Sequence, residues 1–130
     1  MKYIGWRTSY SDPCAFGCSG IEVLDFSGCV FKETKWTCDL EGCRDLKELR
    51  FPKNITFVDD LSTNKGAHYY FSDTEVHFYH TMSLSNTYLH FRQATPPNLH
   101  NPTGTTFYIP KGATTAYYAK FGNNNKYIEE

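Results

Sequence analysis

The feature that most constrains this chain is a short apolar pattern that occurs twice. Residues 18–26 read C-x-x-I-x-x-L-x-F and residues 43–51 read C-x-x-L-x-x-L-x-F. The offset between Cys18 and Cys43 is 25 residues, and all four matched positions carry the same kind of side chain in the same order. A fixed period of this length is typical of solenoids, in which each repeat forms one turn and stacks on the next. The pattern therefore predicts stacked coils with a shared apolar core.

The second copy of the pattern predicts how one turn runs. Leu46, Leu49 and Phe51 supply the apolar side, while Glu48 and Arg50 point outward. The proline that follows cannot donate a ladder hydrogen bond, so it ends the strand. Other segments alternate between apolar and polar residues, or are rich in strand-favouring residues, and predict further strands. These segments are residues 55–58, 74–80, 88–93 and 106–110, with a short last strand around residues 127–128.

The best helix candidate lies near the end of the chain, at residues 114–121. Thr114 or Thr115 is placed to cap it and Gly122 to terminate it. The helix would bring aromatic rings onto the end of the solenoid, where apolar core and strand edge are otherwise exposed. We therefore expect one domain over residues 1–130, with repeats at 14–110 and a C-terminal cap at 111–130.

The repeat and the C-terminal region resemble the bacterial surface-antigen leucine-rich repeats of the BspA-like family. Residues 43–55 match its repeat through Cys, Leu, Leu, Phe, Pro and Ile, and Ala15-Phe16 precede the cysteine of the first copy. The family ending is matched in order by A-T-P-P at 94–97, F-Y-I-P-K-G at 107–112 and A-Y at 116–117. The resemblance implies a mainly β, right-handed leucine-rich-repeat solenoid with a small helical cap. It also implies binding to other macromolecules, often at a bacterial cell surface, without catalysis.

Composition and charge bear on partners and location. The net charge is −1, so no long-range attraction to nucleic acid or to an anionic membrane is expected. No apolar run approaches the roughly 20 residues of a membrane span. The first ten residues lack the apolar core of a signal peptide. We therefore expect either a cytoplasmic protein or a piece of a longer exported chain that acts outside the cell or on its surface.

The five cysteines allow two interpretations. The spacings of Cys14 with Cys18 and of Cys38 with Cys43 loosely fit the two ligand pairs of a structural zinc site. We favour the alternative, in which the cysteines at equivalent repeat positions are buried thiols that pack as small apolar side chains. The sequence contains no nucleophile elbow and no glycine-rich phosphate loop. We therefore expect neither an enzyme nor a bound cofactor.

The predicted outer face of the strands is the candidate binding surface. Strand parity places on it Asp25, Glu48, Arg50, His77, Tyr79, His90, Arg92 and Tyr108. The two histidines at 77 and 90 share this parity, which allows a metal pair or, more ordinarily, a polar contact between strands. Tyr and Arg are enriched in interface hot spots. We expect a protein-interaction or adhesion module whose partner is a host or bacterial surface protein. A glycan-binding module, a zinc-stabilised domain and an ordinary solvated face are the alternatives.

Overall fold

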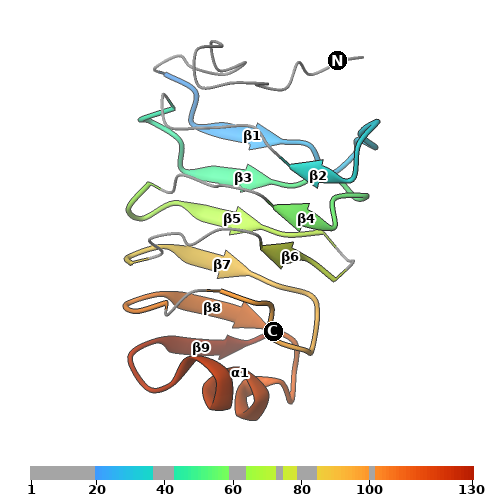
Figure 1. The fold of residues 1–130 in the computed structure, drawn as a ribbon. Coiled ribbons are helices and arrows are strands. Elements are labelled where there is room, and N and C mark those ends of the chain that lie inside the picture. Colours follow the sequence, from blue (N-terminus) through green and yellow to red (C-terminus); the bar gives the residue numbers. More distant parts are fainter. Residues whose placement is uncertain (1–19, 37–42, 59–63, 73–74, 79–84, 100–101) are drawn as a thin grey trace.

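The computed structural model describes residues 20–36, 43–58, 64–72, 75–78, 85–99 and 102–130. Within these ranges the chain forms short strands and one helix (Figure 1). The elements are β1 (Val23–Asp25), β2 (Lys35–Trp36), β3 (Glu48–Arg50), β4 (Phe57–Val58), β5 (His68–Tyr70), β6 (His77–Phe78), β7 (Tyr88–His90), β8 (Thr106–Ile109), α1 (Thr114–Phe121) and β9 (Lys126–Glu129).

The strands form two parallel sheets that stack as a β-solenoid of about four turns. The larger sheet has six strands in the order β1-β3-β5-β7-β8-β9, and the smaller has three in the order β2-β4-β6. Figure 1 shows the larger sheet as successive rungs, with α1 beneath the last rung. The prediction of a mainly β solenoid with a short C-terminal helix is therefore confirmed.

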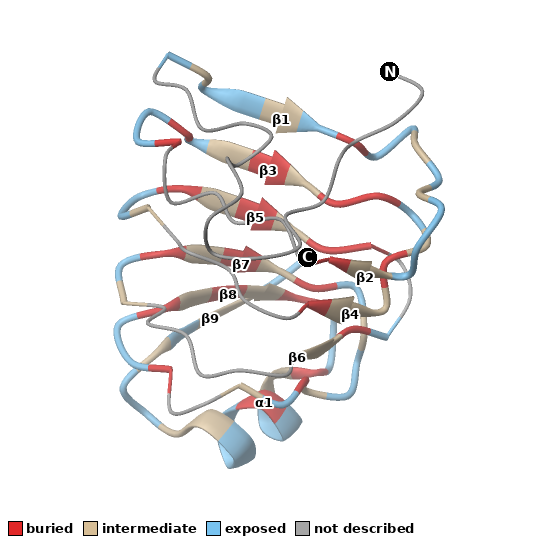
Figure 2. Ribbon diagram, turned by 45° about the horizontal axis from the view of Figure 1, so that its top comes forward, coloured by how far each residue is buried: buried red, intermediate tan, exposed pale blue. Residues whose placement is uncertain are grey.

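The pairing register gives every turn the same inward position. Leu24 pairs with Leu49, confirming the 25-residue offset of the sequence pattern, and the row continues through Tyr69, Leu89 and Phe107. Four of these five side chains, from Leu49 onward, are 0% exposed. Burying a large apolar side chain stabilises the fold by about 1.5–3 kcal/mol. Figure 2 shows this as buried strand centres between exposed turns.

A second column of aromatic rings fills the core where the chain leaves the larger sheet. The ring centroids of Phe51 and Phe71 are 4.8 Å apart, and those of Phe71 and Phe91 are 4.5 Å apart. Both pairs are nearly parallel, at 11° and 4°. Trp36 from the smaller sheet meets Phe51 edge-on at 4.9 Å. The high aromatic content of the chain is therefore used to join the two sheets across the core.

The structure corrects several predicted strands. The third rung of the larger sheet is β5, which the sequence interpretation left inside a connection. Of the predicted strand at 74–80, residues 77–78 form β6 in the smaller sheet, and 79–80 lie outside the described residues. β7 ends at His90, so Arg92 follows the strand instead of belonging to it. Residues 57–58 form β4, within the predicted 55–58, while β2 was not anticipated.

The C-terminal helix is held by β9. Its N-cap is Ala113, which makes no side-chain capping bond, so the expected threonine cap is wrong. Instead Glu129 Oε1 accepts hydrogen bonds from the Thr114 hydroxyl at 2.8 Å and from the Gly112 amide at 3.0 Å. Gly122, with φ of 77°, ends the helix as predicted. The Tyr117 ring is completely buried, and its hydroxyl donates to the Gln93 carbonyl. Among the described residues no helix is long and apolar enough to cross a membrane.

Candidate functional site

The candidate site lies on the outer face of the larger sheet, where side chains from successive rungs form two rows. Because parallel strands pair in register, residues at one position of each strand become neighbours along the solenoid. The first row is Glu48, His68, Tyr88 and Thr106. The second row is Asp25, Arg50, Tyr70, His90 and Tyr108. We call His68, Tyr70, Tyr88, His90 and Tyr108 the ring cluster.

The second row is a continuous stack. The guanidinium carbon of Arg50 lies 4.0 Å from the centroid of the Tyr70 ring. Tyr70 stacks on His90 at 3.9 Å, and His90 stacks on Tyr108 at 4.2 Å with only 6° between the ring planes. Each ring face is therefore covered by its neighbour. The edges of the rings, with their hydroxyl and imidazole groups, are what the stack presents outward.

A hydrogen bond between two histidines joins the rows. His68 Nδ1 lies 2.9 Å from His90 Nε2, so one nitrogen donates a proton and the other accepts it. His68 also stacks on Tyr88 at 4.3 Å, with 6° between the rings. The five rings are thus packed against one another as a single half-buried layer on the sheet.

Electrostatics favour a neutral His90. Its partial burial, followed by the charges of His68 and Arg50, lowers its pKa from 6.5 to about 4. Burial is also the main reason that the pKa of Tyr70 is raised, with the Glu48 carboxylate adding to the effect. At neutral pH the hydrogen-bonded histidine and the tyrosine hydroxyls therefore form an uncharged, polar layer.

Arg50 supplies the positive charge beside this layer. Its Nε lies 2.6 Å from Glu48 Oε1 and 4.0 Å from Asp25 Oδ2. The pKa of Asp25 is lowered, chiefly because the Ser27 hydroxyl and amide donate to its carboxylate. Partly exposed ion pairs of this kind contribute little to stability. Their effect is to hold the guanidinium over Tyr70.

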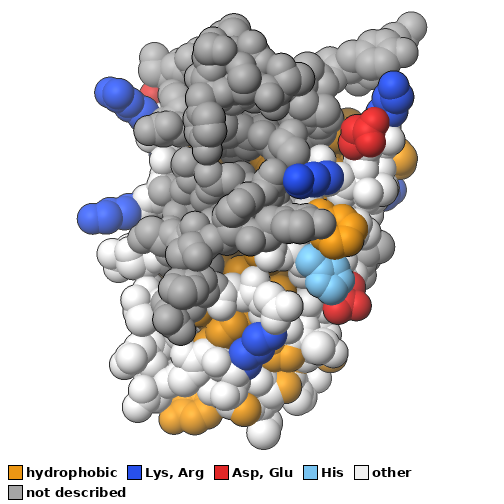
Figure 3. Space-filling view, in the orientation of Figure 1, with side chains coloured by type: hydrophobic (Ala, Val, Ile, Leu, Met, Phe, Trp, Pro, Cys, Tyr) orange, Lys and Arg blue, Asp and Glu red, His pale blue; other side chains and the backbone are white. Residues whose placement is uncertain are grey.

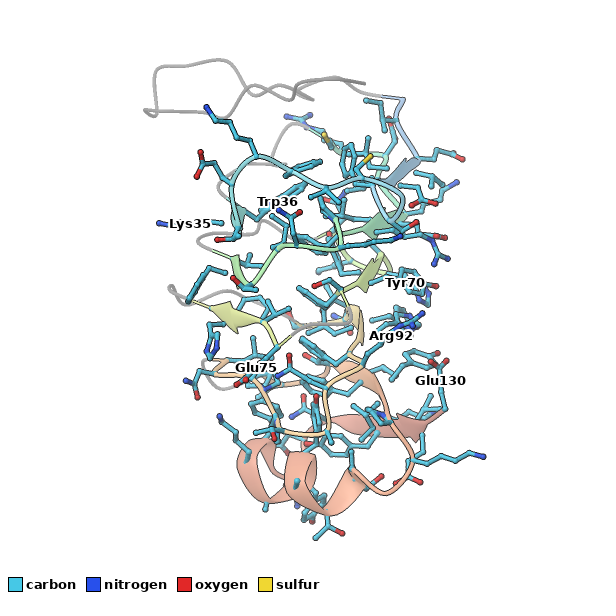
Figure 4. All side chains as sticks on the ribbon, turned by 90° about the vertical axis from the view of Figure 1, so that its right-hand side faces the viewer. Lys35, Trp36, Tyr70, Glu75, Arg92 and Glu130 are labelled. Carbon is cyan, nitrogen blue, oxygen red and sulfur yellow. The ribbon has the colours of Figure 1, made fainter. Side chains whose placement is uncertain are left out.

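A groove of about 630 Å³ borders the ring cluster where the strands of the larger sheet end. Residues from several turns line it, including Arg50, Tyr70 and His90 on the side of the ring cluster. Lys53 and Arg92 belong to the lining as well, and Glu130 adds a carboxylate. Figure 4 shows Tyr70, Arg92 and Glu130 along one edge of the molecule, away from Lys35 on the smaller sheet.

The structure brings together most of the residues predicted for the site. Asp25, Glu48, Arg50, His90 and Tyr108 all lie on the outer face of the larger sheet. The neighbouring groove takes Arg92 into its lining, beyond the end of β7. These placements describe a surface and do not by themselves test binding.

Two predicted residues fall elsewhere. His77 belongs to the smaller sheet, where it stacks on Phe57 at 5.4 Å and its Nε2 lies 3.7 Å from Glu75 Oε1. It is therefore not a strand neighbour of His90, because β5 and not β6 supplies the third rung of the larger sheet. Tyr79 lies outside the described residues.

Sequence reasoning missed His68, Tyr70 and Tyr88, which make up most of the ring cluster. A usable signal was present, because Phe51, Phe71 and Phe91 recur every 20 residues. The apolar or aromatic residue two positions before each phenylalanine is an inward one. Reading that period places His68 and Tyr70 on the outer face, beside Glu48 and Arg50.

Metal and relationship were also considered. Cys14, Cys18 and Cys38 lie outside the described residues, whereas Cys43 is fully buried and Cys29 packs partly buried against the core. Among the described residues no three His, Cys, Asp or Glu side chains are grouped to hold a metal ion. A scan against protein-family models and searches of curated proteins and of solved structures gave no match to this chain.

Proposed function

We propose that this chain is a non-enzymatic protein-binding module that uses the outer face of its larger sheet. The ring cluster is the observation that carries the proposal. Tyr and Arg dominate interface hot spots because they combine a large contact area with directed hydrogen bonds. Here the rings are already ordered by stacking, with Tyr70, His90 and Tyr108 in one column. Binding would therefore cost little side-chain entropy.

The proposed setting is adhesion or recognition at a bacterial cell surface. The support for this setting comes from the sequence, in the resemblance of the repeat and of the C-terminal region to BspA-like leucine-rich repeats. The proposed partner is accordingly a protein of the host or of the bacterial surface. Nothing in the proposal requires a cofactor.

The stacking geometry favours a protein partner over a glycan. Sugars are recognised by aromatic rings mainly through exposed ring faces, on which the apolar side of the sugar packs. In this column the faces of Tyr70 and His90 are covered, by Arg50 and by neighbouring rings. What the column offers is hydroxyl and imidazole edges, which suit hydrogen bonding to backbone and side-chain groups of a protein.

A quantitative pull-down tests this proposal. The wild-type chain, the double variant Tyr70→Ala/Tyr108→Ala and the control Tyr118→Ala are immobilised and exposed to host and bacterial surface extracts. Tyr118 is 51% exposed on α1, so its substitution makes the same chemical change away from the sheet. We expect a partner captured by wild type and control and depleted at least about thirtyfold by the double variant, the effect of losing one hot spot. Equal capture by all three folded proteins would refute the role of the ring cluster.

A further inference from the structure

The groove beside the ring cluster has a polarity of its own. Its charged side chains are Arg50, Lys53 and Arg92 against the single carboxylate of Glu130. The chain as a whole carries a net charge of −1. On the face seen in Figure 3, by contrast, the described Lys and Arg side chains are scattered singly. The groove therefore concentrates positive charge on a protein that is otherwise almost neutral.

The three cations differ in what they can offer a ligand. Arg50 is already held by Glu48 at 2.6 Å and by the Tyr70 ring. Lys53 and Arg92 are exposed at the far side of the groove, on the turns that follow β3 and β7. Lys and Arg side chains only donate hydrogen bonds, so they match ligand groups that only accept, of which the carboxylate is the commonest in proteins.

The repeat sets the spacing between the two exposed cations. β3 and β7 are separated by β5 alone, which is two strand spacings along the solenoid. At roughly 4.8 Å per spacing, equivalent positions on these turns lie about 10 Å apart. In a polyproline II chain, residues i and i+3 lie on one side at a separation of about 9 Å. An extended segment with carboxylates three residues apart would therefore reach both cations.

We propose that this groove binds an extended acidic segment of the partner protein. The inference rests on the proposed function and names the part of the partner that the chain recognises. In the bound arrangement Lys53 and Arg92 each donate to a carboxylate of the segment. The edges of Tyr70 and His90 line the opposite side, and the stacked rings of Phe51, Phe71 and Phe91 form the floor.

Fluorescence anisotropy with defined peptides tests the proposal. The probe is fluorescein-labelled EPPEPPE, compared with its uncharged counterpart QPPQPPQ and with KPPKPPK at near-neutral pH and low salt. We expect the acidic peptide to bind at least about tenfold more tightly than the glutamine peptide, equivalent to about 1.4 kcal/mol. The lysine peptide should not bind. Equal affinity for the acidic and glutamine peptides would overturn the proposal.

Two charge-matched variants locate the site. Lys53→Glu/Arg92→Glu reverses one lysine and one arginine in the groove, and should weaken binding of the acidic peptide at least about tenfold. Arg44→Glu/Lys65→Glu makes the same change on exposed turns before β3 and β5, at the end of the sheet where strands begin. Binding by this control should stay within about twofold of wild type. If both variants lose affinity equally, the attraction is general and the groove is not the site.

Two further outcomes separate this inference from the proposed function. If the peptide fails to bind while the pull-down still captures a partner through Tyr70 and Tyr108, the groove proposal falls and the protein-binding function stands. If an oligogalacturonate of equal charge displaces the acidic peptide at lower concentration, the occupant is an acidic glycan, and the proposed peptide ligand is wrong.

Discussion

Acid should destabilise this fold through His90 in particular. Its pKa is lowered to about 4 in the folded chain, first by burial and then by the charges of His68 and Arg50. In the unfolded chain the ordinary value near 6.5 applies. Above about pH 6.5 the imidazole is neutral in both states and its contribution is complete. As the pH falls toward 4, the unfolded chain takes up the proton and the folded chain does not, so stability is lost.

The size of the effect follows from the separation of the two pKa values. The separation from 6.5 to about 4 is about 2.5 units, and each unit corresponds to about 1.36 kcal/mol, which sets a ceiling of about 3.4 kcal/mol. His90 is only half-buried, so solvent screens part of the interaction. We therefore expect a loss of about 1.5–2 kcal/mol from this residue between pH 7 and pH 4.

Urea unfolding of wild type and His90→Gln over this pH range measures the loss. The carboxylates titrate in both proteins, so the difference between their unfolding free energies isolates His90. The stability advantage of wild type over the variant should fall by about 1.5–2 kcal/mol from pH 7 to pH 4. In His68→Gln the drop should be smaller, because one of the charges that lowers the pKa of His90 is gone. A difference that stays constant with pH would refute this account of the ring cluster.

Three further predictions concern the solenoid itself. Leu49→Ala should cost about 2–5 kcal/mol, because the side chain is 0% exposed in the central inward row; a loss below about 1 kcal/mol in urea unfolding would contradict the stacked core. Asn54→Ala should cost about 1–3 kcal/mol, because its amide bridges turns by accepting from the Phe31 amide at 2.8 Å and donating to the Phe31 carbonyl at 2.6 Å. Faster hydrogen exchange at Phe31 would accompany that loss, and unchanged exchange would exclude the bridge. Gly66→Ala should lower the melting temperature through about 1 kcal/mol of backbone strain, since Gly66 has φ of +78°; Gly28→Ala, where a Cβ would meet no atom within 4 Å, is the control and should melt with wild type.

The fold was largely predictable from the sequence because the inward positions are chemically distinct. Leu49 stands between Glu48 and Arg50, so polarity alone gives the buried face and the strand direction. The offset to Leu24 then gives the pairing register. Alternating polarity of this kind identifies a rung without knowledge of the rest of the molecule.

The third rung was not predictable by the same reasoning. In β5 the inward Tyr69 and the outward Tyr70 are the same residue type, so alternation carries no information there. Only the pairing distinguishes them: Tyr69 is fully buried, with its hydroxyl accepting from the Asn64 amide, while Tyr70 stacks on the outer face. The missing rung led to a strand of the smaller sheet being taken for the third rung, which put His77 beside His90.

The candidate groove lay further from what sequence can reveal. Lys53 and Arg92 follow different strands, and nothing in their local sequence relates them. Their common edge is created by equal stacking of the turns, a property of the whole coil. Charge clusters that form between turns can be recognised only after the number of rungs is known.

The stacked phenylalanines have a consequence for how such a molecule could grow. Phe51, Phe71 and Phe91 are separated by identical lengths of chain and lie in one parallel column. Duplicating one such length would insert another storey about 4.8 Å tall and leave the storeys above and below in their original contacts. The distance between the outermost cations would lengthen by the same step. Chain duplication would thus act as a ruler that resets which carboxylate spacing is recognised.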